Sequence, residues 1–454
     1  MEIFERSLEE SIETFKKLLN ENRMTRFRTE YLALHNYEQS MIFANLEKED
    51  REKIYQYLSP SELADVFDLL ESQDETIDIY FEEMSPPYAA TVLGEMYADN
   101  AVDVLNNLKN RERVNLYMKL MPAESAREIS SLINYLDETA GAIMTTEFIS
   151  VQEGLTLSAA YHRLREQAIK AETIYYVYVV DENDRLVGVI SLRDLIINDE
   201  DKLIHDVMNT RVISVQVNDN QEEVAKMVQD YDLLALPVVG FDHELLGVIT
   251  VDDVLDVMQD EADSDYSGLA AVDVSESHDT PLSAARSRLP WLVTLLFLGM
   301  GTATLISQYD ALIAEASVLS AFVTLITGTA GNAGTQSLAV AVRKLTNKYD
   351  DDNFFTSLMF ELITGAITGF IVGITVMLIV LVWQQNLVLG AVIGIAMMAA
   401  IIVANLAGSF IPKIMDKLGF DPAVASGPFI STLSDLTSVF IYFSIAQLFL
   451  SAII

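Results

Sequence analysis

The sequence contains no cysteine and only five histidines. Without thiols the chain can form neither a disulfide nor a thiolate metal site. The histidines are scattered and show no metal-ligand spacing. The sequence also lacks a phosphate-binding Walker loop, a nucleophile elbow and a recognisable set of acid, base and nucleophile. We therefore predict that the chain is not an enzyme.

Positive charge is also scarce, with 29 Lys and Arg against 67 Asp and Glu, a net charge of −38. Almost all of the excess acid lies in residues 1–280, which hold 22 basic and 58 acidic residues. Residues 281–454 hold 7 basic and 9 acidic residues and are nearly neutral. The acidic part would repel the phosphates of a nucleic acid and is suited to cations. We expect cations, and no nucleic acid, among the partners.

The nearly neutral part contains five apolar runs, each of about the 20 residues needed to cross a bilayer. They cover 289–308, 316–341, 354–382, 387–411 and 424–453. All seven basic residues of this part lie before the first run, between the second and third, or between the fourth and fifth. The positive-inside rule then predicts a multi-pass protein of the cell (inner) membrane. Its acidic part would be cytoplasmic and its C-terminus outside.

Three polar or small-residue patterns interrupt these runs. Asp435 lies in FISTLSDLTSVFIYF (429–443), where a charge costs roughly 3 kcal/mol or more. Either it faces water and a cation, or it is a structural pin that is hydrogen-bonded to Ser and Thr neighbours. The stretch TGTAGNAGTQS (327–337) is expected to weaken its helix and expose carbonyls to a wet cavity, with helix packing as the alternative. Gly365, Gly369 and Gly373 favour close helix packing.

The acidic part contains an internal repeat. MTTEFISV (144–151) matches MNTRVISV (208–215), and GVISLRDLI (188–196) matches GVITVDDVL (247–255). Each copy predicts strand, helix, strand, strand, helix, and the pair resembles tandem CBS modules over 138–200 and 201–258. Such pairs often bind adenine nucleotides such as ATP. The resemblance implies a nucleotide site that includes Tyr176, Arg193, Asp194 and Asp253. Helix capping by the two aspartates is an equal alternative.

Residues 1–137 predict short amphipathic helices that often begin near a proline and stack as in a small solenoid. Residues 259–282 predict a connecting helix. Seven acids lie within 252–265 with no base among them. They indicate either a solvated acidic face or a site that is compact only with divalent cations, which prefer oxygen ligands.

An acidic helical domain, a CBS pair, a connecting helix and five spans together resemble the MgtE family of magnesium transporters. The specific marks are GTAGNAGTQS (328–337), ANLAGSFIP (404–412) and DPAVASGPFISTLSDLTS (421–438). The resemblance implies a multi-domain fold. Its parts are an all-α superhelical N-terminal domain (1–137), an α/β CBS pair, a connecting (plug) helix (259–282) and a five-helix transmembrane domain (283–454).

The resemblance also implies a homodimer with a pore on its twofold axis, gated closed by cytosolic Mg²⁺. Hydrated Mg²⁺ would be bound there by Asp435, Ser431, Gly427 and Asn332; Co²⁺, Mn²⁺ and Ca²⁺ accept similar oxygen ligands. The implied regulatory ligands are Glu222, Asp232, Asp253, Asp256, Glu261, Asp265 and Asp421. The competing hypothesis is a nucleotide-gated membrane protein for another substrate. An anion path would be expected to show basic residues within the spans, which these runs lack.

Overall fold

The computed structural model describes residues 2–70, 77–274, 280–347, 354–418 and 427–453. The chain divides into two compact units, Met1–Met258 and Gln259–Ile454. We describe each unit by itself.

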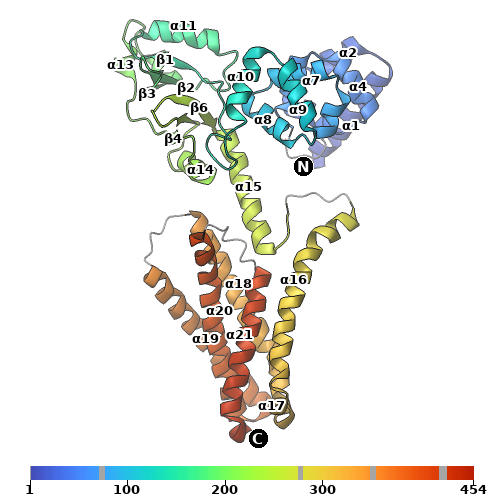
Figure 1. The fold of residues 1–454 in the computed structure, drawn as a ribbon, viewed down its shortest axis with the longest axis vertical. Helices are drawn as coiled ribbons and strands as arrows, with labels where there is room; N and C mark the ends of the chain where they lie inside the picture. Colours follow the sequence, from blue (N-terminus) through green and yellow to red (C-terminus); the bar gives the residue numbers. More distant parts are fainter. Residues whose placement is uncertain (1, 71–76, 275–279, 348–353, 419–426, 454) are drawn as a thin grey trace. The chain divides into compact units, whose positions relative to one another are not determined.

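In residues 2–70 and 77–132 the first unit contains helices and no strand, as the sequence predicts. They are α1 (Glu2–Asn20), α2 (Met24–Tyr31), α3 (Asn36–Ala44), α4 (Lys48–Tyr57), α5 (Pro60–Phe67), α6 (Ile77–Glu83), α7 (Pro86–Glu95), α8 (Ala98–Asn107), α9 (Arg111–Leu120) and α10 (Ala123–Leu132). Pro60 begins α5 behind a capping box between Ser59 and Glu62. Helices two apart in the sequence pack together, α3 on α5, α5 on α7 and α7 on α9. The stack forms the expected superhelix (Figure 1).

Two three-stranded sheets follow, each made by one copy of the repeat. The first copy comprises β1 (Ser150–Gln152), α11 (Leu157–Gln167), β2 (Tyr176–Val180), β3 (Leu186–Ser191) and α12 (Leu192–Ile197). After α13 (Ile204–Val207), the second comprises β4 (Val215–Gln216), α14 (Gln221–Asp230), β5 (Ala235–Val239), β6 (Leu245–Thr250) and α15 (Val251–Ala270). In both sheets the first strand is parallel to the second, which is antiparallel to the third. The predicted strand and helix order is confirmed.

The helical stack and the second repeat share one hydrophobic core. Leu105 of the stack and Val224 and Ile249 of the repeat are buried in the same cluster. Thr145 bridges to Val248, and a Cβ atom on Gly247 would lie only 2.7 Å from the carbonyl oxygen of Thr145. This close packing brings acidic residues of both parts together.

Helix α15 differs from the prediction at both ends. It begins directly after β6, so the last helix of the repeat and the connecting helix are one continuous helix. It ends at Ala270, and Ala271 has a left-handed φ of 57°. The predicted connecting helix over 259–282 was therefore wrong in both bounds. The physical reason is that no glycine or proline interrupts the sequence between Val251 and Ser267.

The described residues of the second unit form five long helices: α16 (Pro281–Ser307), α18 (Ser320–Asn347), α19 (Phe354–Gln384), α20 (Leu387–Lys417) and α21 (Gly427–Leu448). Three short helices, α17 (Asp310–Glu315), η1 (Ser317–Leu319) and α22 (Leu450–Ile453), lie among them. In the described residues, α16, α19, α20 and α21 are long and apolar enough to span a membrane. Helix α18 has the length, but its polar stretch lowers its hydrophobicity, so five crossings stay a prediction.

Helices α18–α21 pack together, whereas α16 packs mainly against α21 (Figure 1). No residue in the apolar window of α16 is buried in the described chain. This helix therefore leaves its apolar surface available for lipid or protein.

Glycines set the closest helix contacts. Helix α18 continues without a break through 327–337, so the expectation of a weakened helix there was wrong. A Cβ atom on Gly408 would lie 2.2 Å from the carbonyl oxygen of Gly334, which shows how tightly α20 approaches α18. On α19, a Cβ atom on Gly369 would lie 2.9 Å from Met398 O, and one on Gly373 would lie 2.6 Å from Gly394 O. The predicted packing role of this glycine stripe is confirmed.

Candidate functional site

Asp435 lies in the middle of α21, one turn after Ser431, and faces α18. A Cβ atom on Gly331 would lie 2.8 Å from Ser431 Oγ and 3.8 Å from Asp435 Oδ1. Asp435 is half-buried, and its carboxylate accepts no hydrogen bond from any described residue. The nearby Thr437 and Ser438 hydroxyls donate to carbonyl oxygens of their own helix instead. The structural-pin alternative is therefore wrong for the described residues.

The other two predicted pore residues lie on the same two helices. Asn332 follows Gly331 on α18, and its side chain is exposed in the single chain. Gly427 begins α21, two turns before Asp435. A Cβ atom on Gly427 would lie 3.0 Å from the carbonyl oxygen of Leu269, near the end of α15. The structure therefore places Ser431 and Asp435 together and puts Gly427 at the contact between α21 and α15.

A second group of carboxylates surrounds the first turn of α15. Glu172, Asp252 and Asp253 each offer an oxygen within 4.8 Å of the others, and they form the one such group in the described ranges. The backbone N–H of Thr250 donates to Asp253 Oδ2 at 3.3 Å, and its hydroxyl donates to the same oxygen. Glu172 Oε1 lies 3.2 Å from this hydroxyl, and Glu172 Oε2 is buried without a hydrogen-bond partner. A cation could use these unpaired oxygens.

The helical stack adds further acids to this group. Asp99 and Asp103 lie one turn apart on α8, and Asp99 is only 7% exposed. Its Oδ1 accepts a hydrogen bond from the backbone N–H of Asn100 at 2.9 Å. Glu147 accepts hydrogen bonds from the Ala98 N–H at 3.3 Å and from the Thr145 hydroxyl at 2.6 Å. The group therefore collects acids from α8, from the first repeat and from the start of α15.

Burial without a nearby positive charge raises the pKa values of these carboxyl groups. Burial, followed by the charges of Asp253 and Glu172, raises the pKa of Asp99 well above its usual value. Burial and the charge of Asp253 raise the pKa of Glu172 to about 8 and that of Asp103 to about 6. Burial also raises the pKa of Asp253 to about 6. Without a bound cation, the carboxylates of this group repel one another. Hard divalent cations bind to carboxylate oxygens of this kind.

The remaining regulatory candidates are spread along the chain. Asp256 is exposed on α15, and Glu261 and Asp265 are half-buried further along the same helix. Glu222 lies in the first turn of α14, and Asp232 follows that helix with a left-handed φ of 52°. Asp421 lies outside the described residues. Of the predicted regulatory ligands, the structure brings only Asp253 into a multi-carboxylate group in the described chain.

The nucleotide candidates of the first repeat gather at one end of its sheet. Tyr176 pairs with Ser191 across β2 and β3, and Arg193 is exposed on α12. The Ser191 hydroxyl donates to Asp194 Oδ2 at 2.6 Å, and the Asp194 N–H donates to Ser191 Oγ at 3.1 Å. Asp194 therefore caps α12, as the alternative predicts. These bonds use one of the two carboxylate oxygens of Asp194. The other oxygen could therefore contact a nucleotide while Asp194 caps the helix.

Sequence reasoning missed Asp99, Asp103, Glu147 and Glu172. None of them lies in a motif, and each looks like one more acid in an acidic chain. Their significance comes from packing between distant segments.

Comparison with known proteins covers the whole chain. Family models match for the MgtE intracellular N domain at 34–138, for CBS domains at 140–200 and 204–260, and for a divalent cation transporter, MgtE, at 323–445. The chain is 58% identical to the magnesium transporter MgtE of Enterococcus faecalis, with 98% of each chain covered. It is 34% identical to the magnesium transporter MgtE of Bacillus subtilis, with 96% of each covered.

Two solved structures resemble the acidic part. The soluble part of a magnesium transporter is 52% identical and has a TM-score of 0.55; the match covers 56% of this chain and 99% of the other. The cytosolic domain of the Mg²⁺ channel MgtE in complex with ATP is 33% identical and has a TM-score of 0.51, with 54% and 99% covered. From its near full-length match to curated relatives, the chain belongs to the MgtE family of membrane-spanning magnesium transporters.

Proposed function

We propose that this chain imports Mg²⁺ through a pore that contains Asp435 and that cytosolic Mg²⁺ closes this pore. The observation that carries the proposal is the Asp435 carboxylate, which lies in the apolar helix α21 and accepts no hydrogen bond from the described residues. A charge in such a place is favourable only when it faces water or a counter-ion. A hydrated cation that passes through the pore supplies both the water and the counter-ion.

The pore lies between two copies of the chain. Two Asp435 carboxylates would balance one divalent charge. Because Mg²⁺ sheds its water reluctantly, the ion stays hydrated and contacts Asp435, Ser431, Gly427 and Asn332 through water. The uncovered apolar surface of α16 supports a partner subunit. The N-terminal domain, the CBS pair and the connecting helix face the cytoplasm, and the C-terminus lies outside.

Gating begins at the carboxylate group around Asp253. Cations that bind there stabilise the compact arrangement of α8, Glu172 and α15 by mass action. Closure follows because the ion binds this arrangement more tightly than the open one. The other regulatory ligands are Glu222, Asp232, Asp256, Glu261, Asp265 and Asp421. Helix α15 runs without a break from Asp253 to Leu269, which contacts Gly427 at the start of α21.

Adenine nucleotide is a second ligand of the cytoplasmic part. The ATP complex of the 33% identical cytosolic domain supports this assignment. Tyr176, Arg193 and Asp194 form the candidate site in the first repeat, and Asp253 is the equivalent of Asp194 in the second. ATP would regulate the pore and would not be hydrolysed, so the chain acts as a transporter and not as an enzyme.

The direct test is Mg²⁺ uptake by the full chain in proteoliposomes, with the Mg²⁺ concentration varied on the side of the acidic domains. Uptake should be fast when this concentration is low and should fall as it rises into the millimolar range. Uptake that does not depend on Mg²⁺ on this side would contradict the gating proposal. No uptake under any condition would contradict the transport proposal.

A further inference from the structure

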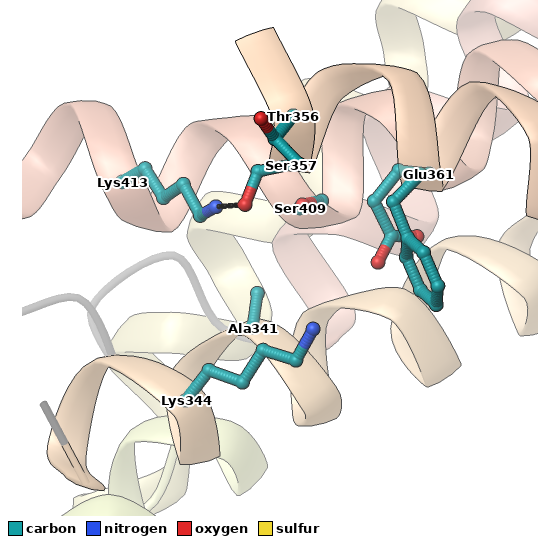
Figure 2. A pocket seen from close by; sticks show the side chains of 8 residues that line it. Ala341, Lys344, Thr356, Ser357, Glu361, Ser409 and Lys413 are labelled. Carbon is teal, nitrogen blue, oxygen red and sulfur yellow. Dashed lines mark hydrogen bonds between the residues drawn. The ribbon is translucent and has the colours of Figure 1, made fainter. Parts of the chain in front are cut away.

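A cavity of about 240 Å³ opens among helices α18, α19 and α20 (Figure 2). At about 30 Å³ per water molecule, it has room for roughly eight waters. Its polar lining consists mainly of Lys344 from α18, Ser357 and Glu361 from α19, and Ser409 and Lys413 from α20. Asp435 does not line it, and neither transport nor gating as proposed above uses it.

Two ammonium groups enter this cavity from different helices. Lys413 Nζ donates a hydrogen bond to Ser357 Oγ at 2.6 Å. Lys344 Nζ lies 5.1 Å from the centre of the Phe360 ring. Figure 2 shows the Lys344 and Lys413 side chains reaching toward the same space. Two lysine ammonium groups that line one cavity favour an anionic ligand.

The cavity also has a buried hydrogen-bond acceptor. Glu361 is only 8% exposed, and its Oε2 accepts a hydrogen bond from Ser337 Oγ at 3.2 Å. The Ser337 hydroxyl also lies 2.8 Å from the carbonyl oxygen of Asn405, so α18 joins both neighbouring helices here. A ligand for this cavity should therefore carry a hydrogen-bond donor as well as an anion.

The depth of the cavity points to a lipid. Ser357 lies in the first turn of α19, and Lys344 and Lys413 lie near the ends of α18 and α20. Glu361 is six residues beyond Phe355, where the apolar span of α19 begins, which is about 9 Å along the helix. Headgroup phosphates and the first carbons of lipid chains occupy this level of a membrane, and basic pockets between spans there bind lipid headgroups.

We propose that this cavity binds the headgroup of an anionic phospholipid, with phosphatidylglycerol as the matching chemistry. Its phosphodiester accepts hydrogen bonds from Lys344, Lys413 and the Ser357 hydroxyl. A glycerol hydroxyl of the headgroup donates to Glu361. Two lysine side chains line the cavity, and basic pockets at this level of a membrane favour a net negative headgroup over a zwitterionic one. The bound lipid ties α18, which also carries Gly331 beside Asp435, to α19 and α20.

The test is native mass spectrometry of the purified full chain with equimolar phosphatidylglycerol, phosphatidylethanolamine and phosphatidylcholine. The wild type should retain phosphatidylglycerol over phosphatidylcholine by roughly thirtyfold, because each of two lysine contacts contributes about 1 kcal/mol. The double variant K344Q/K413Q should lose this preference, and the single variant K344Q, at an exposed position, should lose part of it. The matched control R343Q/K417Q removes the same charge from the same two helices outside the cavity and should behave as wild type.

Two further arms identify the ligand. A large excess of inorganic phosphate should not displace the lipid, whereas displacement at the concentration of the added lipid would show that free phosphate is the ligand and would overturn the proposal. E361Q should reduce the preference for phosphatidylglycerol over phosphatidic acid, which has no headgroup hydroxyl; an unchanged ratio would overturn the role of Glu361. Equal retention of all three lipids by the wild type, or wild-type retention by K344Q and K344Q/K413Q, would also overturn the proposal.

Discussion

The carbonyl oxygen of Leu269 lies 3.0 Å from the position that a Cβ atom would occupy on Gly427. Leu269 also packs with Val342 of α18 and Ile430 of α21. The last turn of α15 therefore rests on the first turn of the helix that carries Asp435. This contact is close enough that only glycine fits without a shift.

Gly427→Ala should weaken closure by Mg²⁺. The added methyl group requires α15 to move by a few tenths of an ångström, and a strain of about 0.5–1 kcal/mol would raise the Mg²⁺ concentration that closes the pore by roughly two- to fivefold. The measurement is uptake in proteoliposomes against Mg²⁺ on the side of the acidic domains. Gly299→Ala is the control, because a Cβ atom there meets nothing within 4 Å. Equal shifts in both variants would argue against the contact.

Asp435→Asn should lower Mg²⁺ flux by about tenfold or more, since tenfold corresponds to the loss of only about 1.4 kcal/mol of charge interaction with the ion. The substitution keeps the shape of the side chain and removes its charge. Flux is measured with Mg²⁺ low on both sides so that gating does not limit it, and chromatography in detergent checks that the protein stays folded. Wild-type flux through the Asn variant would exclude a pore role for the carboxylate.

The pH dependence of stability follows from the raised pKa values. Glu172 (about 8), Asp253 (about 6) and Asp103 (about 6) titrate above the ordinary range near 4, so the folded protein binds protons more tightly than the unfolded chain. Their contribution to stability is therefore greatest at low pH and is lost as the pH rises from about 4 to about 8.

In Mg²⁺-free buffer, the unfolding temperature of the full chain in detergent should be lower at pH 8 than at pH 6 by roughly 3–5 °C. Millimolar Mg²⁺ should remove most of the difference, because the cation replaces the protons. Glu172→Gln should flatten the change between about pH 5 and 8. A rise of unfolding temperature with pH in the absence of Mg²⁺ would contradict this electrostatic account.

Neutralising Asp253, Asp256, Glu261 and Asp265 together should make closure less sensitive to Mg²⁺. In the wild type, millimolar MgCl₂ should protect residues 252–274 from protease, and NaCl of equal ionic strength should not. Screening acts over about 8 Å for any salt at physiological ionic strength, whereas a site requires the divalent ion. Equal protection by NaCl would show screening without a site. Closure of the fourfold variant at the wild-type Mg²⁺ concentration would place the sensor elsewhere.

ATP should bind through the first repeat with an affinity that Asp194→Ala lowers. Asp194→Asn retains a side-chain oxygen for the helix cap and removes the charge, so it separates capping from ligand binding. Calorimetric titration with and without Mg²⁺ measures the affinity, and thermal unfolding shows whether α12 stays capped. Absence of binding heat in the wild type under both conditions would exclude this ligand.

The sequence predicts much of this fold because its signals are local or repeated. The matching segments around 144 and 208 predict both sheets, and the apolar runs predict the long helices of the second unit. Asp435 stands out because a carboxylate is rare inside an apolar run. The acids around Asp253 could be predicted only in part. Asp99 reaches it through the shared core of the stack and the second repeat, and Glu172 reaches it from the first repeat beside the Thr250 hydroxyl; no local pattern encodes that packing.

Two predictions about helices were wrong: the bounds of the connecting helix and the weakened helix at 327–337. The stretch 251–267 contains no helix breaker, which predicts the continuous α15 better than the repeat boundary does. The glycines at 328–337 suggest a weak helix when α18 is considered alone. In the bundle, neighbouring backbones pack against Gly334 and stabilise the helix, so tertiary packing outweighs intrinsic propensity.

A continuous helix also fixes the angle about its axis between any two of its side chains. Between Val251, which begins α15, and Leu269, near its end, each residue adds about 100° of rotation and 1.5 Å of rise. A rigid rod of this kind transmits rotation about its axis as well as displacement along it. The number of residues between Asp253 and Leu269 therefore sets the direction in which Leu269 points about the helix axis relative to Asp253, and adding or deleting a single residue between them would turn Leu269 by about 100°.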